Sequence, residues 1–151
     1  MPSFKGEFEH SVDEKGRISF PAKLRKAVSP QARNQFTILK GLEKCLYLYP
    51  DDEWQKVEGR LLQINSFTHE GSTVLRNFLR SAQDIELDRQ YRLPLPPRLM
   101  QWSAIKDSAI FIGTGNRIEI WSPDQLAEAD QNLSMESYQE LFEQVMSNVD
   151  Q

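Results

Sequence analysis

The stretch Asp13-Glu14-Lys15-Gly16-Arg17-Ile18-Ser19-Phe20-Pro21-Ala22-Lys23-Leu24 decides the organisation of this sequence. It recurs 75 residues further along as Asp88-Arg89-Gln90-Tyr91-Arg92-Leu93-Pro94-Leu95-Pro96-Pro97-Arg98-Leu99. Asp, Arg, Pro and Leu occupy equivalent places in the two copies, the apolar positions agree, and a cation recurs at Lys23 and Arg98. Self-similarity at a fixed offset is the signature of an internal repeat.

A second match follows at an offset of 72, where Leu46-Tyr47-Leu48-Tyr49 lies over Ile118-Glu119-Ile120-Trp121. Each segment is closely followed by Pro and Asp, at Pro50-Asp51 and at Pro123-Asp124. Because order as well as composition is preserved, the chain contains two copies of one unit. A unit of about 55 residues is small for independent folding, so we expect the two units to pack as a pseudo-symmetric pair.

Each unit is expected to begin with a hairpin. Residues 7–12 alternate between polar and apolar side chains, which is the period of a strand with one buried face. The tetrapeptide Asp13–Gly16 has the chemistry of a type I turn, with a glycine that is free to adopt positive φ. The chain returns as a strand at 17–20, and Pro21 suits the first position of a short helix.

The same reading along the chain gives the other elements. We expect strands at 36–39, 45–49, 84–88, 92–95, 109–112 and 118–121, and helices starting near 51, 72, 97, 122 and 134. The fold class is therefore α+β. We expect a first repeat at 5–65, a helical connector at 66–82, a second repeat at 83–130 and a C-terminal amphipathic helix at 131–151.

The charge of the chain is unevenly distributed. The 151 residues carry a formal net charge of −4, which at first argues against a nucleic-acid partner. However, residues 1–40 hold 8 basic and 4 acidic residues, residues 41–118 hold 10 of each, and residues 119–151 hold 8 acidic and no basic residues. The protein has a basic head and an acidic tail, so the average charge does not exclude DNA binding.

Several function classes find no support in the sequence. The single cysteine, Cys45, forms neither an internal disulfide nor a cysteine-based zinc site, and the two histidines, His10 and His69, do not make a metal site. No secretion signal or apolar stretch of about 20 residues is present. We find no catalytic constellation, and we expect a cytoplasmic protein that is not an enzyme and has no cofactor, no metal, no small-molecule substrate and no membrane partner.

At Asp13-x-x-Gly16-Arg17-Ile18-x-x-Pro21-x-x-x-Arg25 the sequence resembles the MraZ family of bacterial transcriptional regulators, which carry two tandem SpoVT/AbrB-type swapped-hairpin units. The resemblance covers essentially the whole chain. It implies a small β-barrel built from two interlocked swapped-hairpin repeats, with assembly into oligomeric rings. It also implies a nucleoid-associated protein that binds specific sequences of double-stranded DNA near the promoter of a cell-division and cell-wall gene cluster.

The resemblance also implies which residues contact DNA. In similar proteins, basic residues in and beside the motif face DNA, and the matching positions are Lys15, Arg17, Lys23, Arg25, Arg92 and Arg98. Arginine suits this role because its guanidinium binds guanine edges or phosphates through two hydrogen bonds. The alternative reading is that Arg17 and Arg92 pair with Asp13 and Asp88 across their hairpins. Both hold if the aspartate orients the arginine.

The second motif departs from the family pattern at Tyr91, where glycine is usual. A left-handed conformation costs a residue other than glycine roughly 1–2 kcal/mol, so the second turn is either strained or of another type. The Tyr91 ring has two available partners, a base or sugar of DNA or its own hairpin, and we expect the hairpin. The nearby prolines confine the following strand to a sheet edge. The first unit is therefore the better-supported DNA-binding unit.

Two functions from different classes remain open. The first is an oligomeric DNA-binding regulator, since few basic residues per chain bind weakly and several copies on repeated sites multiply the affinity. The second is a protein-interaction module of the antitoxin type, which would hold its partner through the acidic, amphipathic segment 134–151.

Overall fold

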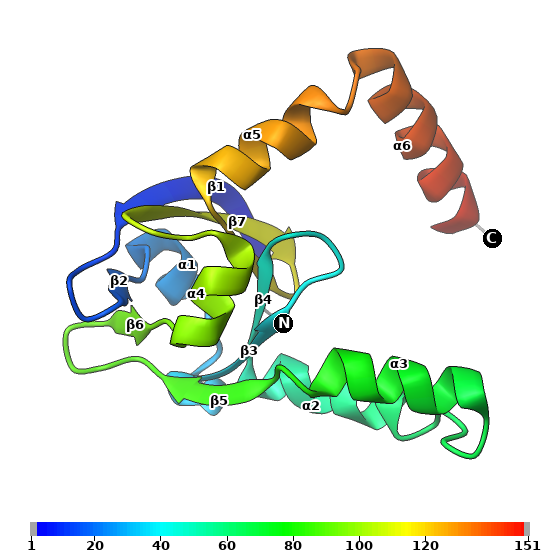
Figure 1. Cartoon of the computed structure of the whole chain (residues 1–151), viewed down its shortest axis with the longest axis horizontal. Helices are drawn as coiled ribbons and strands as arrows, with labels where there is room; N and C mark the ends of the chain where they lie inside the picture. Colours follow the sequence, from blue (N-terminus) through cyan, green and yellow to red (C-terminus); the bar gives the residue numbers. More distant parts are fainter. Residues whose placement is uncertain (1–2, 150–151) are drawn as a thin grey trace.

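A computed structural model describes residues 3–149, and it shows a mixed α+β protein (Figure 1). The predicted C-terminal segment ends with residues 150 and 151, which lie outside the described residues. The first repeat contains β1 (Phe4–Ser11), β2 (Arg17–Ser19), α1 (Ala22–Ala27), the 3-10 turn η1 (Pro30–Ala32), β3 (Gln35–Lys40), β4 (Leu46–Pro50), α2 (Asp51–Leu61) and α3 (His69–Leu79). The second contains β5 (Gln83–Glu86), β6 (Arg92–Pro94), α4 (Pro97–Ser103), β7 (Ser108–Gly115), β8 (Ile118–Trp121), α5 (Pro123–Gln131) and α6 (Met135–Val149).

The predicted strands and helices are confirmed with small shifts of their ends. The largest shift is in the connector, where α3 begins at His69 instead of near residue 72. Thr68 explains this earlier start, because its hydroxyl oxygen accepts a hydrogen bond of 3.0 Å from the backbone N–H of Gly71 and so caps the helix.

The repeats exchange their first strands. The main sheet is antiparallel and runs β1-β7-β8-β4-β3-β5. Strand β1 of the first repeat thus pairs with β7 of the second, while β5 of the second repeat pairs with β3 of the first. This order reads the same from both edges once the repeats are interchanged. Neither repeat completes its sheet without the other, as the small size of each unit led us to expect.

Two residue pairs mark the pseudo-twofold axis that relates the repeats. In the separate two-stranded sheet formed by β2 and β6, Ile18 lies opposite Leu93, its own counterpart in the repeat. Where β4 meets β8 in the main sheet, Tyr47 lies opposite its counterpart Glu119. The sequence match of 13–24 with 88–99 is therefore expressed as a symmetry of the fold.

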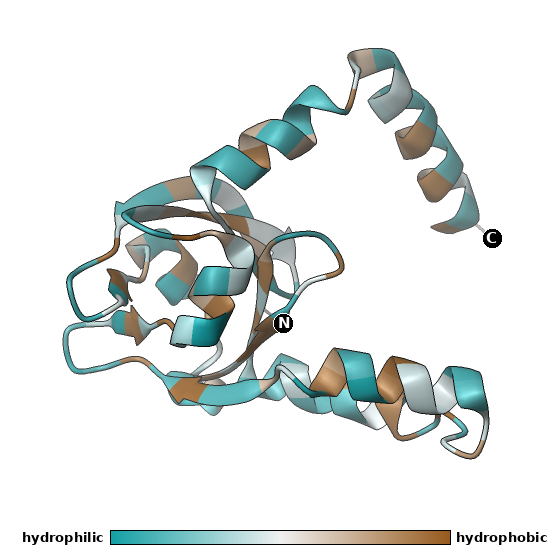
Figure 2. Ribbon diagram, viewed as in Figure 1, coloured by the Kyte–Doolittle hydropathy of each residue, from teal (hydrophilic) through white to brown (hydrophobic). Residues whose placement is uncertain are grey.

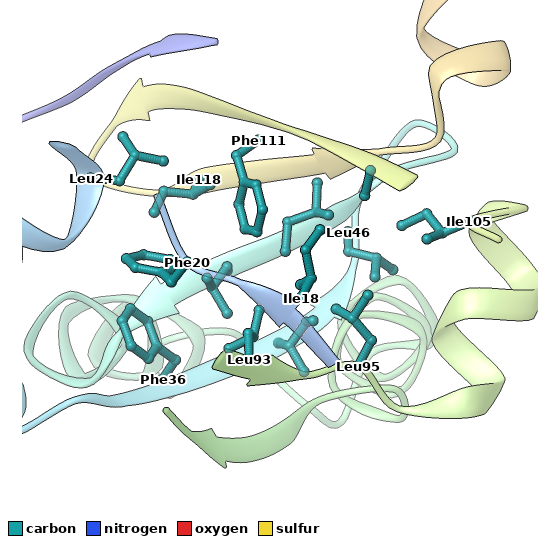
Figure 3. Close-up of a cluster of buried hydrophobic side chains, with 14 of the residues drawn as sticks. Ile18, Phe20, Leu24, Phe36, Leu46, Leu93, Leu95, Ile105, Phe111 and Ile118 are labelled. Carbon is teal, nitrogen blue, oxygen red and sulfur yellow. The ribbon is translucent and has the colours of Figure 1, made fainter. Parts of the chain in front are cut away.

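The main core lies between the six-stranded sheet and the β2–β6 ribbon (Figure 3). Ile18 and Leu93 are fully buried there, with Phe20 and Leu95 from the segments that follow the ribbon and Leu24 and Leu99 from α1 and α4. Burying an Ile or Leu side chain contributes about 1.5–3 kcal/mol. This burial fixes which face of the ribbon points outward.

A second apolar cluster stabilises α2, α3 and α5. It contains Trp54 of α2, whose ring stacks on Phe78 of α3 at 6.3 Å, together with Trp121 at the end of β8 and Leu126 of α5. In Figure 1, the α2–α3 and α5–α6 arms project on the side of the sheet away from the paired hairpins. The ribbon and the helical arms are therefore separate surfaces.

The predicted closed barrel is wrong. The edge strands β1 and β5 of the six-stranded sheet do not pair with each other, and β2 and β6 form a sheet of their own. Proline explains why this ribbon is short, because Pro21 follows one strand and Pro94 ends the other, and proline has no N–H to extend a ladder. Only an isolated bridge between Val12 and Ile18 continues β1 towards the ribbon.

Candidate nucleic-acid interface

The β2–β6 ribbon places the turns of the two hairpins side by side (Figure 1). Because side chains alternate along a strand, burial of Ile18 and Leu93 points Arg17 and Arg92 to the outer face. Arg17 pairs with Pro94, two residues from Arg92, which is a diagonal relation of about 7–8 Å between Cα atoms. The ribbon therefore carries two outward arginines, one from each repeat.

The first turn is organised by the Asp13 carboxylate. Its Oδ1 accepts hydrogen bonds of 2.9 Å from the backbone N–H groups of Lys15 and Arg17, and its Oδ2 accepts one of 2.9 Å from Nε of Arg17. The pKa of Asp13 is lowered, chiefly by the Arg17 backbone N–H and also by the Arg17 side chain and the Lys15 N–H. The carboxylate thus closes the turn and orients the arginine together.

The second turn repeats this arrangement. The Asp88 Oδ1 accepts from the backbone N–H groups of Gln90 and Arg92 at 2.9 Å, and its Oδ2 accepts from Nε of Arg92 at 2.8 Å. Its pKa is lowered, again mainly by the Arg92 backbone N–H. The intrahairpin pairing foreseen for both arginines is confirmed. It occupies Nε, and within residues 3–149 the terminal guanidinium nitrogens of Arg17 and Arg92 make no hydrogen bond.

Tyr91 adopts the conformation of the glycine that it replaces. Its φ is 58°, against 77° for Gly16, and its N–H donates to the Asp88 carbonyl at 2.9 Å as that of Gly16 donates to Asp13. The carbonyl of Tyr91 accepts from Phe20 N–H, just as Gly16 accepts from Leu95. Of the two possibilities, the strained turn is the one present.

The Tyr91 ring contacts the first repeat. The guanidinium carbon of Arg25 in α1 lies 3.8 Å from the ring centroid, which is a cation–π contact. The residue that corresponds to Arg25 in the second repeat is Met100, and its sulfur lies 3.6 Å from the place where a Cβ on Gly16 would be. A tyrosine–arginine pair on one side of the axis thus replaces a glycine–methionine pair on the other.

The six predicted contact residues fall into two groups. Lys15, Arg17, Arg25 and Arg92 belong to the hairpins or contact them. Lys23 instead lines a surface cavity of ≈ 640 Å³ with Lys5 and Lys26. Arg98 lines another, of ≈ 370 Å³, with Lys40 and Arg80. Neither cavity includes a residue of the two turns.

The sequence reasoning missed the companions of Lys23 and Arg98. A signal existed for Lys26, because it follows Lys23 by three residues on a helix and shares its face. No sequence signal joins Lys40, Arg80 and Arg98, because strand β3, the end of α3 and α4 meet only in the folded chain.

The remaining candidate groups give no catalytic arrangement that we can describe. Residues 3–149 contain no group of three His, Cys, Asp or Glu side chains able to hold a metal ion. Cys45 is buried, and burial raises the pKa of its thiol to about 12. Within the same residues, no helix combines the length and apolar character needed to cross a membrane.

Comparison with known proteins gives a consistent result. The family model described as "MraZ protein, putative antitoxin-like" matches the chain twice in tandem, at residues 3–77 and 78–148. The transcriptional regulator MraZ of Syntrophomonas wolfei is 38% identical over 143 residues, which cover 95% of this chain and 96% of the relative. The proteins of the same name from Natranaerobius thermophilus and Clostridium beijerinckii are 34% and 37% identical, with 95% and 91% of this chain covered and 96% and 94% of the relatives.

Proposed function

The chain belongs to the MraZ family, and from this premise we propose that it is a transcriptional regulator that binds specific DNA sequences through its paired hairpins, 13–17 and 88–92. The name of its relatives supports the regulatory role. The observation that carries the DNA-binding role is the pair of outward arginines, Arg17 and Arg92, each held at Nε by its own aspartate.

The shape and chemistry of the ribbon suit the major groove. That groove is about 12 Å wide and admits a two-stranded β-ribbon. The buried pair Ile18 and Leu93 fixes the ribbon on the core, and each aspartate restrains the guanidinium of its arginine before binding. An arginine whose terminal nitrogens stay available donates to both acceptors of a guanine, which is the commonest specific contact in the major groove.

The two hairpins present different surfaces to the DNA. Lys15 of the first turn corresponds to Gln90 of the second, and Glu14 corresponds to Arg89. Arg25 is stacked on Tyr91, while its counterpart Met100 carries no charge. We therefore propose contacts from Lys15, Arg17, Arg25 and Arg92 to one asymmetric site, and contacts from Lys23 and Arg98 to the flanking phosphates.

The finer features follow from the resemblance and complete the proposal. The repeats are swapped-hairpin units, an assignment supported by the exchange of β1 and β5 between them. The protein acts as an oligomer on repeated sites near the promoter of a cell-division and cell-wall gene cluster, in the cytoplasm at the nucleoid. Oligomerisation supports binding because linked copies raise the effective concentration of each hairpin pair at neighbouring sites.

A protein-interaction module remains the second candidate. The observation in its favour is that every residue from 130 to 149 is exposed, so that α6 is free to hold a partner. Under this reading, a stoichiometric protein partner copurifies with the chain and the chain does not shift the promoter DNA.

Fluorescence anisotropy with a duplex from upstream of the protein's own gene tests the proposal. We expect binding at least 10³-fold tighter than to an unrelated duplex of equal length. The logarithm of the binding constant should fall with the logarithm of the salt concentration, by about 0.9 for each phosphate contacted. Equal affinity for the two duplexes would contradict sequence-specific binding.

A further inference from the structure

The exposed apolar side chains gather in two places (Figure 2). Of the large apolar residues that are exposed within residues 3–149, all except Leu42 and Tyr91 belong either to the α2–α3 arm or to residues 133–149. Soluble proteins rarely leave contiguous apolar patches uncovered, and such patches mark interaction sites. The two patches therefore need partners.

The patch on α6 is a continuous stripe. Tyr138, Leu141, Phe142, Val145 and Val149 share one face of this 15-residue helix, and each is between 50% and 70% exposed. Glu136, Glu140 and Glu143 recur with the same spacing but are displaced by two residues from Tyr138, Phe142 and Val145, which is about 200° around the helix. Docking through the stripe therefore buries no carboxylate.

The patch on the other arm is hollow. Where α2 and α3 meet, they enclose a groove of ≈ 520 Å³ whose walls include Leu61, Leu62, Ile64, Leu75 and Leu79. Leu62 is 86% exposed, and Phe67, in the loop between the two helices, is 99% exposed. A groove of this kind accepts the apolar face of an amphipathic helix.

The connection between α5 and α6 leaves the stripe open. In the first repeat, the segment 62–68 separates α2 from α3, and α3 folds back so that Phe78 stacks on Trp54. In the second repeat, only 132–134 separate α5 from α6, and Ser134 caps α6 by accepting a hydrogen bond of 3.1 Å from Ser137 N–H. In Figure 1 the helix consequently stands away from the rest of the molecule.

Charge favours the groove as the surface that receives α6. Helix α6 carries three glutamates and no cation, so two α6 helices from different copies bring like charges together. The α3 wall of the groove carries Arg76, adjacent to Leu75, and Arg80 follows at the end of the helix. An anionic helix and a cationic wall are complementary.

We propose that α6 of one copy of this chain docks its apolar stripe into the α2–α3 groove of the next copy. The interface is heterologous, because each copy offers a helix on one side and a groove on the other, and such contacts close into a ring when the rotation permits. The inference rests on the oligomer of the proposed function and names the surfaces that build it. The hairpins take no part in the interface and stay available for DNA.

Two charge insertions and their mixture test this interface by analytical ultracentrifugation at 10–50 µM without DNA. Phe142→Glu disrupts the stripe and Leu62→Glu disrupts the groove, and both residues are exposed, so the monomer should keep its fold. We expect the wild-type chain to be oligomeric and each variant to sediment as a 17.5 kDa monomer. Gln144→Glu adds the same charge to the opposite face of α6 and should leave the oligomer intact.

The mixture distinguishes the proposed contact from other modes. An equimolar mixture of the two variants retains one intact stripe and one intact groove, so it should form a 1:1 dimer. A monomeric wild-type chain, or an intact oligomer of Leu62→Glu beside a dissociated Phe142→Glu, would overturn the proposal, since the latter indicates α6 pairing with itself. DNA binding by single copies is measured separately through Arg17, so failure of the interface and failure of the proposed function give different results.

Discussion

The guanidinium of Arg25, from the first repeat, lies 3.8 Å from the ring centroid of Tyr91, from the second. The contact joins α1 to the turn of the opposite hairpin, and it exists because Tyr91 occupies a left-handed position with φ of 58°. It breaks the symmetry of the two repeats at the surface proposed to read DNA. A cation–π pair at a partly exposed site contributes about 0.5–1 kcal/mol.

This contact predicts a coupling between the two residues. Arg25→Ala and Tyr91→Ala should each destabilise the protein, and the double variant should be less destabilised than the sum of the two by about 0.5–1 kcal/mol. Chemical denaturation of the four proteins measures this. Additive effects would mean that the contact contributes nothing in solution.

The left-handed turn predicts an order of stability at position 91. Tyr91→Gly and Tyr91→Ala both remove the ring, but only glycine adopts positive φ without steric cost. The glycine variant should therefore be more stable than the alanine variant by about 1 kcal/mol. Equal denaturation midpoints would show that the turn is not left-handed in solution.

The aspartates of the turns predict a pH dependence. Both carboxyl groups have a lowered pKa in the folded protein, so their contribution to stability is complete above the ordinary aspartate pKa of about 3.9 and is lost as the pH falls through the lowered value. Asp13→Asn should therefore destabilise the protein at pH 7, and the difference from wild type should shrink below about pH 4. Thermal unfolding across this range measures it, and a pH-independent difference would contradict the ionic role of Asp13.

Two glycines predict opposite responses to alanine. A Cβ on Gly113 would lie 2.3 Å from the backbone nitrogen of Lys5, so Gly113→Ala should force β7 and β1 apart at a cost of about 1–3 kcal/mol. A Cβ on Gly59 would have no neighbour within 4 Å, and in this helix Gly59→Ala should stabilise the protein by about 0.5–1 kcal/mol. Denaturation midpoints that shift in the same direction for both variants would contradict the strand pairing of β1.

Sequence reasoning succeeded where periodicity and turn chemistry act locally. The repeat at 13–24 and 88–99 predicted both hairpins, and Ser122 caps α5 as its motif indicated, accepting a hydrogen bond of 3.0 Å from Gln125 N–H. Alternation along a strand shows which face is buried but does not identify the neighbouring strand. The exchange of β1 and β5 between repeats, and the open sheet, therefore required the structure.

The candidate site was predicted to a similar extent. The pairing of Arg17 with Asp13 depends on residues four apart in one turn, so the sequence contained it. The contact between Arg25 and Tyr91 joins residues that are remote in sequence, and the cavities of Lys23 and Arg98 depend on the packing of several elements. These relations follow from the tertiary fold, which no local pattern encodes.

The central claim is that the outward arginines of the paired hairpins read DNA, and the affinity of Arg17→Ala and Arg92→Ala for the upstream duplex tests it most directly. Arg60→Ala is the matched control, because it removes the same charge from the α2–α3 arm. The account predicts that each hairpin variant binds about 10- to 100-fold more weakly at constant salt, while Arg60→Ala binds as wild type. Wild-type affinity in both hairpin variants, with their fold intact by circular dichroism, would contradict the account.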